Sequence, residues 1–227
     1  MTLPEPRDLP ELLSRLDTWV AREVPLHHAT LRPGVTDAVL DAFEARQGVT
    51  LPPAMRALYR WHDGGDLFGL DFLSLEHLEF RRNQWAEHAA ERMTDLDEDI
   101  VSHPPGAIRL LYATGDWLPF LHDGSGNHVA LDLSPGPARR PGQTITTCRE
   151  EEHRYVLAPD LDTFLREYLR RLEAGRVTVR RPSDFSDETQ EVRLQEPGGR
   201  APEGYNVLAD LFPGFGAAPE HMNPYWP

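Results

Sequence analysis

Apolar residues in the first third of the chain recur at the spacing of a helix. Between Leu9 and Val20 they return every three or four positions, which predicts an amphipathic helix. Thr36 and Gly48 are placed to begin and end a second helix. Leu51-Pro52-Pro53 opens a third, because proline is tolerated in a first turn whose amides have no intrahelical partner. Ser74 is a candidate N-cap for a polar helix running to about Met93.

From Ile108 the pattern changes to short apolar or β-branched runs separated by Gly, Pro and Asp. These runs are predicted strands, and residues 67–73 are another; they cover residues 108–112, 117–121, 128–133 and 144–148. Alternation in 128–133 indicates a strand with one buried face. An apolar stripe between Asp160 and Gly175 predicts a closing helix with Asp160 as N-cap. Helices, then strands, then a helix favour an α+β fold with a sheet dominated by antiparallel pairs and packed against several helices.

The composition changes again after Arg176. The stretch 176–227 is dense in Pro and Gly, and its aromatic residues gather in 205–215 and 225–226. It has too few periodic positions for a core of its own, but its aromatics argue against disorder. We therefore expect one domain over 1–175 and a C-terminal extension over 176–227 that lies on this domain or on a neighbouring subunit.

Charge and composition narrow the class of protein. The formal net charge is −14, which disfavours direct binding to nucleic acid or anionic lipid. The basic side chains are all Arg; with 21 Pro this indicates GC-rich coding and a bacterial source. The one cysteine, Cys148, rules out an internal disulfide. No secretory signal and no apolar run of membrane-spanning length is visible, so a cytoplasmic protein is expected.

Sequence motifs for nucleotide, nucleophile or metal chemistry fail when tested. A phosphate-binding loop needs a lysine that the chain lacks, and no Gly-x-Ser-x-Gly occurs. Asp123, Ser125 and Asn127 match three positions of a calcium loop, but the required Gly and Glu positions hold His128 and Ser134. A glycine-rich hairpin explains these residues better, so neither cofactor nor metal is expected.

Histidines leave one enzymatic alternative open. His62, His122 and His128 each lie near an Asp, so a metal-dependent hydrolase using them with Asp132 is conceivable if folding brings them together. Their spacing gives no paired-ligand motif. Partly buried or surface histidines without a metal are therefore favoured, and no catalytic residue is assigned.

Several segments, in this order, resemble the SMI1/KNR4 family of the SUKH superfamily. Residues 51–65 are similar to its Leu-Pro helix ending in a Gly pair, with His62-Asp63-Gly64 where the family usually has Asn-Gly. Residues 115–120 resemble its Trp-x-Pro strand, and 123–133 its Gly-Asn turn followed by Leu-Asp-Leu. The resemblance covers about 35–175 and implies a single SUKH-like domain. The residues that carry this fold signature are Leu51, Pro52, Gly64, Gly65, Trp117, Pro119, Gly126, Asn127 and Asp132.

The resemblance also implies a function. Members are not known as enzymes, and bacterial ones are regarded as immunity proteins that neutralise toxins, often nucleases. We therefore expect a bacterial immunity protein whose partner is a cognate toxin, such as a basic nuclease domain. An acidic surface would serve such binding; the candidate residues are Asp63, Asp95, Asp97, Glu98, Asp99, Asp116 and Asp123. The alternative is a housekeeping interaction or scaffold protein of the same fold, and the oligomeric state is left open.

Overall fold

The computed structural model describes residues 4–90, 99–147, 149, 151–180, 191–196, 198–199 and 207–221. Its helices are α1 (Leu9–Glu23), α2 (Pro25–His28), α3 (Asp37–Gln47), α4 (Pro53–Trp61), α5 (Leu75–Ala90) and α6 (Leu161–Glu173), with a 3-10 turn η2 (Leu208–Leu211). Its strands are β1 (Gly65–Leu67), β2 (Leu70–Phe72), β3 (Val101–His103), β4 (Trp117–His122), β5 (His128–Asp132), β6 (Gln143–Thr147), β7 (His153–Ala158), β8 (Val177–Arg180) and β9 (Glu191–Leu194).

Seven of these strands form one sheet in the order β1-β2-β4-β5-β6-β7-β3. Neighbours are antiparallel except for β3 and β7, which are parallel. Strands β8 and β9 form a separate hairpin. The predicted α+β fold with a mixed, mainly antiparallel sheet and several helices is therefore confirmed.

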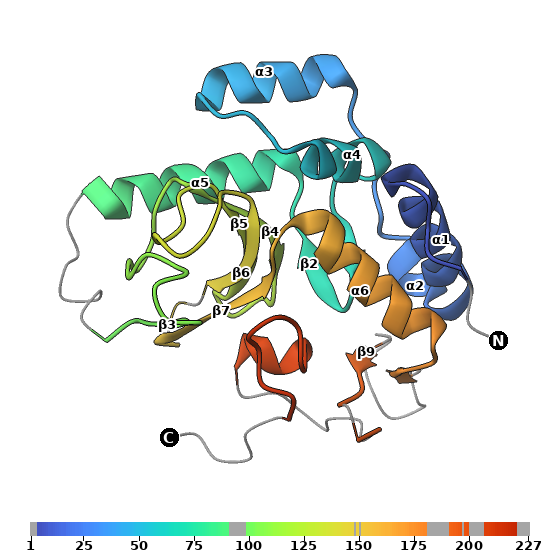
Figure 1. Ribbon diagram of the computed structural model, residues 1–227. Coiled ribbons are helices and arrows are strands. Elements are labelled where there is room, and N and C mark those ends of the chain that lie inside the picture. The colour runs from blue at the N-terminus through green and yellow to red at the C-terminus, as the bar shows by residue number, and fades with distance from the viewer. Residues whose placement is uncertain are drawn as a thin grey trace.

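Helices cover both faces of this sheet (Figure 1). Helix α5 lies across one face, where Trp85 meets Trp117 edge to face at 6.1 Å between ring centroids. Helices α1, α4 and α6 bury the other face in the larger core, which contains Val129 and Leu131 of β5. The prediction that β5 has one buried face was wrong: all five of its residues are buried. Tertiary packing decided this, because α5 encloses a face whose residues include His128 and Asp132.

Capping residues place the helix ends as the sequence indicates. Asp160 accepts a hydrogen bond from Thr163 N at 2.7 Å, which confirms the predicted N-cap of α6. Ser74 Oγ accepts from His77 N at 3.2 Å before α5. Thr36 precedes α3 in extended backbone but makes no side-chain cap. Gly48 ends α3 with a left-handed φ of 62°.

Two predicted strands differ from the structure. The segment 67–73 is split by a turn at Phe68 and Gly69, between Leu67 at the end of β1 and β2 at Leu70–Phe72, because both turn residues have positive φ (64° and 75°), as a type I′ hairpin turn requires. Residues 108–112 are not a strand. Ile108 instead packs into the small cluster around Trp85 and Trp117, and its amide donates to Ser102 Oγ at 2.9 Å.

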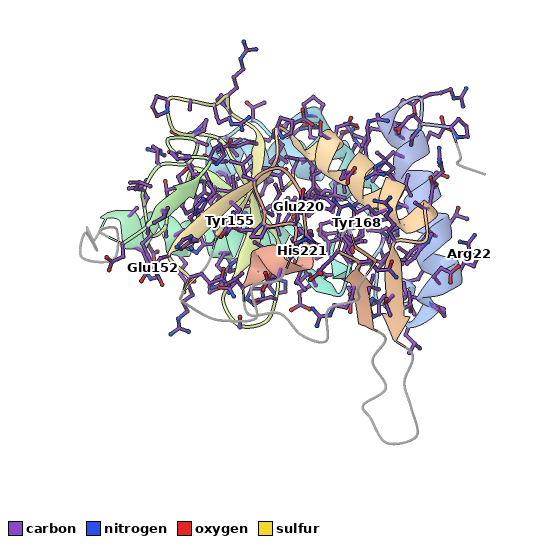
Figure 2. All side chains as sticks on the ribbon, turned by 60° about the horizontal axis from the view of Figure 1, so that its bottom comes forward. Arg22, Glu152, Tyr155, Tyr168, Glu220 and His221 are labelled. Carbon is purple, nitrogen blue, oxygen red and sulfur yellow. The ribbon has the colours of Figure 1, made fainter. Side chains whose placement is uncertain are left out.

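The described part of the C-terminal segment packs on the domain. Phe212 and Phe215 are each 1% exposed and contact Phe164 of α6, both with 5.5 Å between ring centroids. Ala217 N donates to Val156 O of β7 at 2.8 Å. In Figure 2 the residues around Glu220 and His221 lie in front of β7 and α6, which carry Tyr155 and Tyr168. Tyr205, Tyr225 and Trp226 lie outside the described residues, as does Cys148, and a domain boundary at 175 stays a prediction.

A search of the described helices for a membrane span finds none with the necessary length and apolar character.

Candidate functional site

The described acidic residues among those proposed for partner binding lie in different parts of the domain. Asp116 and Asp123 flank opposite ends of β4, which at about 3.3 Å per residue places them roughly 20 Å apart. Asp116 is exposed and pairs with Arg109 at 2.7 Å. Asp99 is exposed as well. Asp95, Asp97 and Glu98 lie outside the described residues, so their part in a partner surface stays a prediction.

Two of these acids are held by hydrogen bonds within the fold. Asp63 Oδ1 accepts from the backbone N of Leu75 at 2.7 Å and so caps the start of α5. Asp123 accepts from the backbone amides of Ser125 (2.8 Å) and Asn127 (3.1 Å) and from both of their side chains. These four donors keep the pKa of Asp123 below its usual value even though burial opposes them. Both carboxylates shape the chain locally.

Glycines allow two turns in the segments that resemble the family: the turn after α4 and the hairpin between β4 and β5. Gly64 and Gly65 have φ of 95° and 131°, where a side chain would be strained. In the hairpin after β4, the positive φ values belong to Gly124 (82°) and Gly126 (117°). Asn127 does not have a positive φ and instead contributes its side chain to Asp123.

At the end of β4 and β5 that lies away from their connecting hairpin, Trp117 is paired with Asp132 on the neighbouring strand, and both residues are fully buried. Asp132 accepts from Gln143 Nε2 and from Ser134 N, both at 3.0 Å. Burial nevertheless raises the pKa of this carboxyl, because it penalises the charged form more than these bonds favour it. Asp132 therefore has no route to a substrate and acts within the fold.

A pocket of about 430 Å³ opens at the hairpin end of β4 and β5, on the sheet face that α5 covers. Helix α5, the loop before β4, the ends of β4 to β6 and the hairpin between β4 and β5 surround it. Its lining residues are Arg81, Gln84, Trp85, His88, Tyr112, Ala113, His122, Gly124, Ser125, Gly126, His128, Thr147 and Arg149. His122, His128 and Thr147 meet there because they are paired in register on neighbouring strands.

His128 is the most unusual group in this pocket. It is 2% exposed, and neither of its ring nitrogens has a partner within hydrogen-bonding geometry, although the Gly126 backbone attracts the ring weakly. The Trp85 ring meets it edge-on at 5.1 Å, and the His122 ring lies at 4.5 Å. Burial lowers the pKa of His128 to about 3, with His122 and Arg81 adding repulsion that outweighs attraction to Asp123. The imidazole is therefore neutral at neutral pH.

This burial predicts an acid-sensitive fold. Because the folded pKa lies below the ordinary value of about 6.5, the unfolded chain takes up a proton first as the pH falls. The contribution of His128 to the free energy of unfolding is fully present above pH 6.5. It decreases by about 1.4 kcal/mol for each pH unit between pH 6.5 and pH 3. Urea unfolding at pH 7 and pH 5 should show a loss about 2 kcal/mol larger for the natural chain than for His128→Gln. Equal losses in the two proteins would contradict the assignment.

The proposed metal set is dispersed. His62 hydrogen-bonds to Asp17 at 3.1 Å near the end of α4, whereas His122 and His128 line the pocket. His128 and Asp132 stand at opposite ends of β5, about 13 Å apart. Among the described residues, no three His, Cys, Asp or Glu side chains could hold a metal together. The hydrolase alternative therefore loses its geometric basis.

Sequence reasoning missed the α5 side of the pocket. Arg81, Gln84 and His88 belong to a polar helix, and their spacing of three and four places them on one helical face with Trp85 beside them. That spacing was the available signal. It could not show that this face turns toward the sheet, because polar residues on a helix usually face solvent.

Comparison with known proteins identifies the family of this chain and overturns the predicted immunity role. A sequence profile of the SMI1/KNR4 family (SUKH-1) matches residues 34–167. A Schizosaccharomyces pombe cell wall biosynthesis/cell cycle regulator is 32% identical over 195 residues, covering 78% of this chain and 38% of the relative. The Saccharomyces cerevisiae cell wall assembly regulator is 24% identical, and the match covers 70% of this chain and 39% of the relative. A Neurospora crassa glucan synthesis regulatory protein is 26% identical, and the match covers 80% of this chain and 40% of the relative.

These relatives overturn the expected role. They are fungal proteins named as regulators of cell-wall or glucan synthesis, so the predicted bacterial toxin–antitoxin role, with a cognate toxin as partner, is wrong. The chain spans about two fifths of their length. Their names describe regulators rather than enzymes. With a family profile matched over more than half of its length, and with the helices and mainly antiparallel sheet described above, the chain belongs to the SMI1/KNR4 (SUKH-1) family.

Proposed function

We propose that this chain is a non-enzymatic, cytoplasmic interaction module that regulates cell-wall polysaccharide synthesis. The observation that carries the proposal is that three relatives, each aligned over at least 70% of this chain, are named as regulators of cell-wall or glucan synthesis. Because this chain spans only part of their length, it would supply the regulatory domain and not every activity of those proteins.

The geometry supports binding rather than catalysis. A general acid or base must reach the proton that it transfers, at about 2.6–3.2 Å from a bound substrate. Asp63 and Asp123 are instead occupied by backbone amides, and Asp132 is fully buried. Ser125 Oγ donates to Asp123 at 2.7 Å, so this hydroxyl faces a turn carboxylate in place of an activating histidine.

Exposed carboxylates remain candidates for partner contact. Asp99 and Asp116 reach solvent, and the net charge of −14 attracts basic surfaces and speeds encounter with them. We keep these residues as proposed contacts of a regulatory partner.

A domain exchange tests the proposal. This chain would replace the aligned region of the S. pombe regulator, in cells whose own copy of that regulator is deleted. We expect the chimera to restore cell-wall glucan content, since the exchanged domain would keep its regulatory contacts. The readout is glucan per unit of cell wall, compared with cells carrying the regulator without the exchanged residues.

The matched control carries the aligned region of the S. cerevisiae regulator in the same position. If this control restores glucan while the chimera with our chain, expressed at the same level, does not, the proposed role is wrong.

A further inference from the structure

The pocket beside His128 is basic in an acidic protein. Among the described residues, its thirteen lining side chains include two arginines and three histidines, of which His128 is neutral at neutral pH, and no Asp or Glu. In the whole chain, Asp and Glu outnumber Arg by 37 to 23. A positive, partly enclosed lining of this kind concentrates the field on an anion that enters it.

Arg81 provides the charge, and no carboxylate among the described residues forms an ion pair with it. Its described hydrogen bond goes to Gln84 Oε1 at 2.6 Å, within α5. Arg15, Arg46 and Arg109, by contrast, each pair with a carboxylate. Desolvation lowers the pKa of Arg81, with no opposing contribution from an acid, yet the group stays charged. A guanidinium in this state suits a carboxylate or phosphate, which it can bind through two parallel hydrogen bonds.

His128 adds a second requirement. A neutral imidazole presents one N–H donor and one nitrogen acceptor, and here both are buried with no partner in good hydrogen-bonding geometry, since the Gly126 backbone attracts the ring only weakly. Leaving such groups unpaired costs about 1–3 kcal/mol each, so a molecule that pairs with them is favoured. An anionic oxygen could accept from the donor, whereas the acceptor nitrogen needs a hydroxyl. The ligand should therefore carry hydroxyl groups beside its charge.

Size limits the ligand further. A volume of about 430 Å³ is at the lower end of small-molecule pockets, which span about 300–1,000 Å³. Trp85 and Tyr112 offer ring surface for the carbon skeleton of a ligand. We propose that this pocket binds a small hydroxylated anion, a phosphate- or carboxylate-bearing molecule of sugar size, with Arg81 holding the charge and His128 a neighbouring hydroxyl. This inference is independent of the proposed role in cell-wall regulation.

Titration calorimetry on the full chain tests it with three probes: glucose 6-phosphate, glucuronate and uncharged glucose. We expect at least one of the two anions to bind and glucose not to bind. The phosphate and carboxylate probes show which anion the pocket takes. Arg81→Gln should weaken binding of that anion by about 10–100-fold, the loss expected for a hydrogen bond to a charged group.

Arg82→Gln is the matched control. Arg82 is the next residue on α5, but its guanidinium donates to Gln47 and does not line the pocket. Affinity should be unchanged in this variant. Should Arg81→Gln fail to fold, His128→Phe keeps a buried ring without its nitrogens and should also lose binding. The proposal is overturned if neither anion binds, if glucose binds equally well, or if Arg82→Gln weakens binding as much as the pocket variants do.

Discussion

Phe212→Ala is expected to lower the free energy of unfolding by about 3–5 kcal/mol, the usual cost of truncating a fully buried Phe. Phe212 is 1% exposed and lies against Phe164, Tyr168 and Phe215. It belongs to the C-terminal segment, beyond the residues matched by the family profile. The expected loss follows because this segment closes the core over α6. Urea denaturation measured by tryptophan fluorescence gives the value directly.

Phe80→Ala is the matched control, since Phe80 is 63% exposed on α5. Its unfolding free energy should change by no more than about 0.5 kcal/mol. If Phe212→Ala proves equally mild, Phe212 does not close the core over α6.

Gly65→Ala is expected to destabilise the protein by about 2–6 kcal/mol, through backbone strain and overpacking of about 1–3 kcal/mol each. Gly65 has a φ of 131°, which side-chain-bearing residues rarely adopt. A Cβ there would lie 2.6 Å from Thr30 O and 2.7 Å from Leu31 Cα, and neither backbone atom can move aside cheaply. Thermal and urea unfolding of the purified variant measure the effect.

Gly175→Ala separates the two causes. Gly175 also has a positive φ, 67°, but a Cβ there would meet nothing within 4 Å. Its cost should be about 1–2 kcal/mol, the penalty of a left-handed conformation alone. A loss at Gly65 no greater than at Gly175 would show that the close approach of 30–31 to β1 has no energetic weight.

Local patterns predicted much of the fold. Asp160 could be recognised as an N-cap because a short acidic side chain before an apolar stripe satisfies amides at the helix start. Gly126 could be placed in a hairpin because glycine tolerates positive φ. These features depend on residues close in sequence. The turn at Phe68 was not predicted, because a bulky residue at positive φ is exceptional and needs tertiary packing to hold it there. In the structure the Phe68 ring packs on the Tyr168 ring, with 3.7 Å between their centroids.

The sequence was likewise sufficient to identify the family but not the role of the protein. The ordered segments around Gly64-Gly65, Trp117 and Gly126-Asn127 were enough to identify the family, and the profile match confirms it. The expected immunity role was wrong because these residues encode turns and buried packing, which related proteins keep whatever they bind. An overall negative charge did not identify a partner either, since charge affects solubility as much as recognition.

By itself, the sequence determined the main helices, the central strands, the α+β class and the family, since helix periodicity, caps and glycine turns act over a few residues. Only the tertiary structure decided where polar groups meet. Arg81 and His128 are far apart in the chain and come together because α5 crosses the sheet face on which His128 stands. The structure likewise buried Asp132 and brought Phe212 onto α6. Such contacts depend on how whole elements pack, which no local pattern specifies.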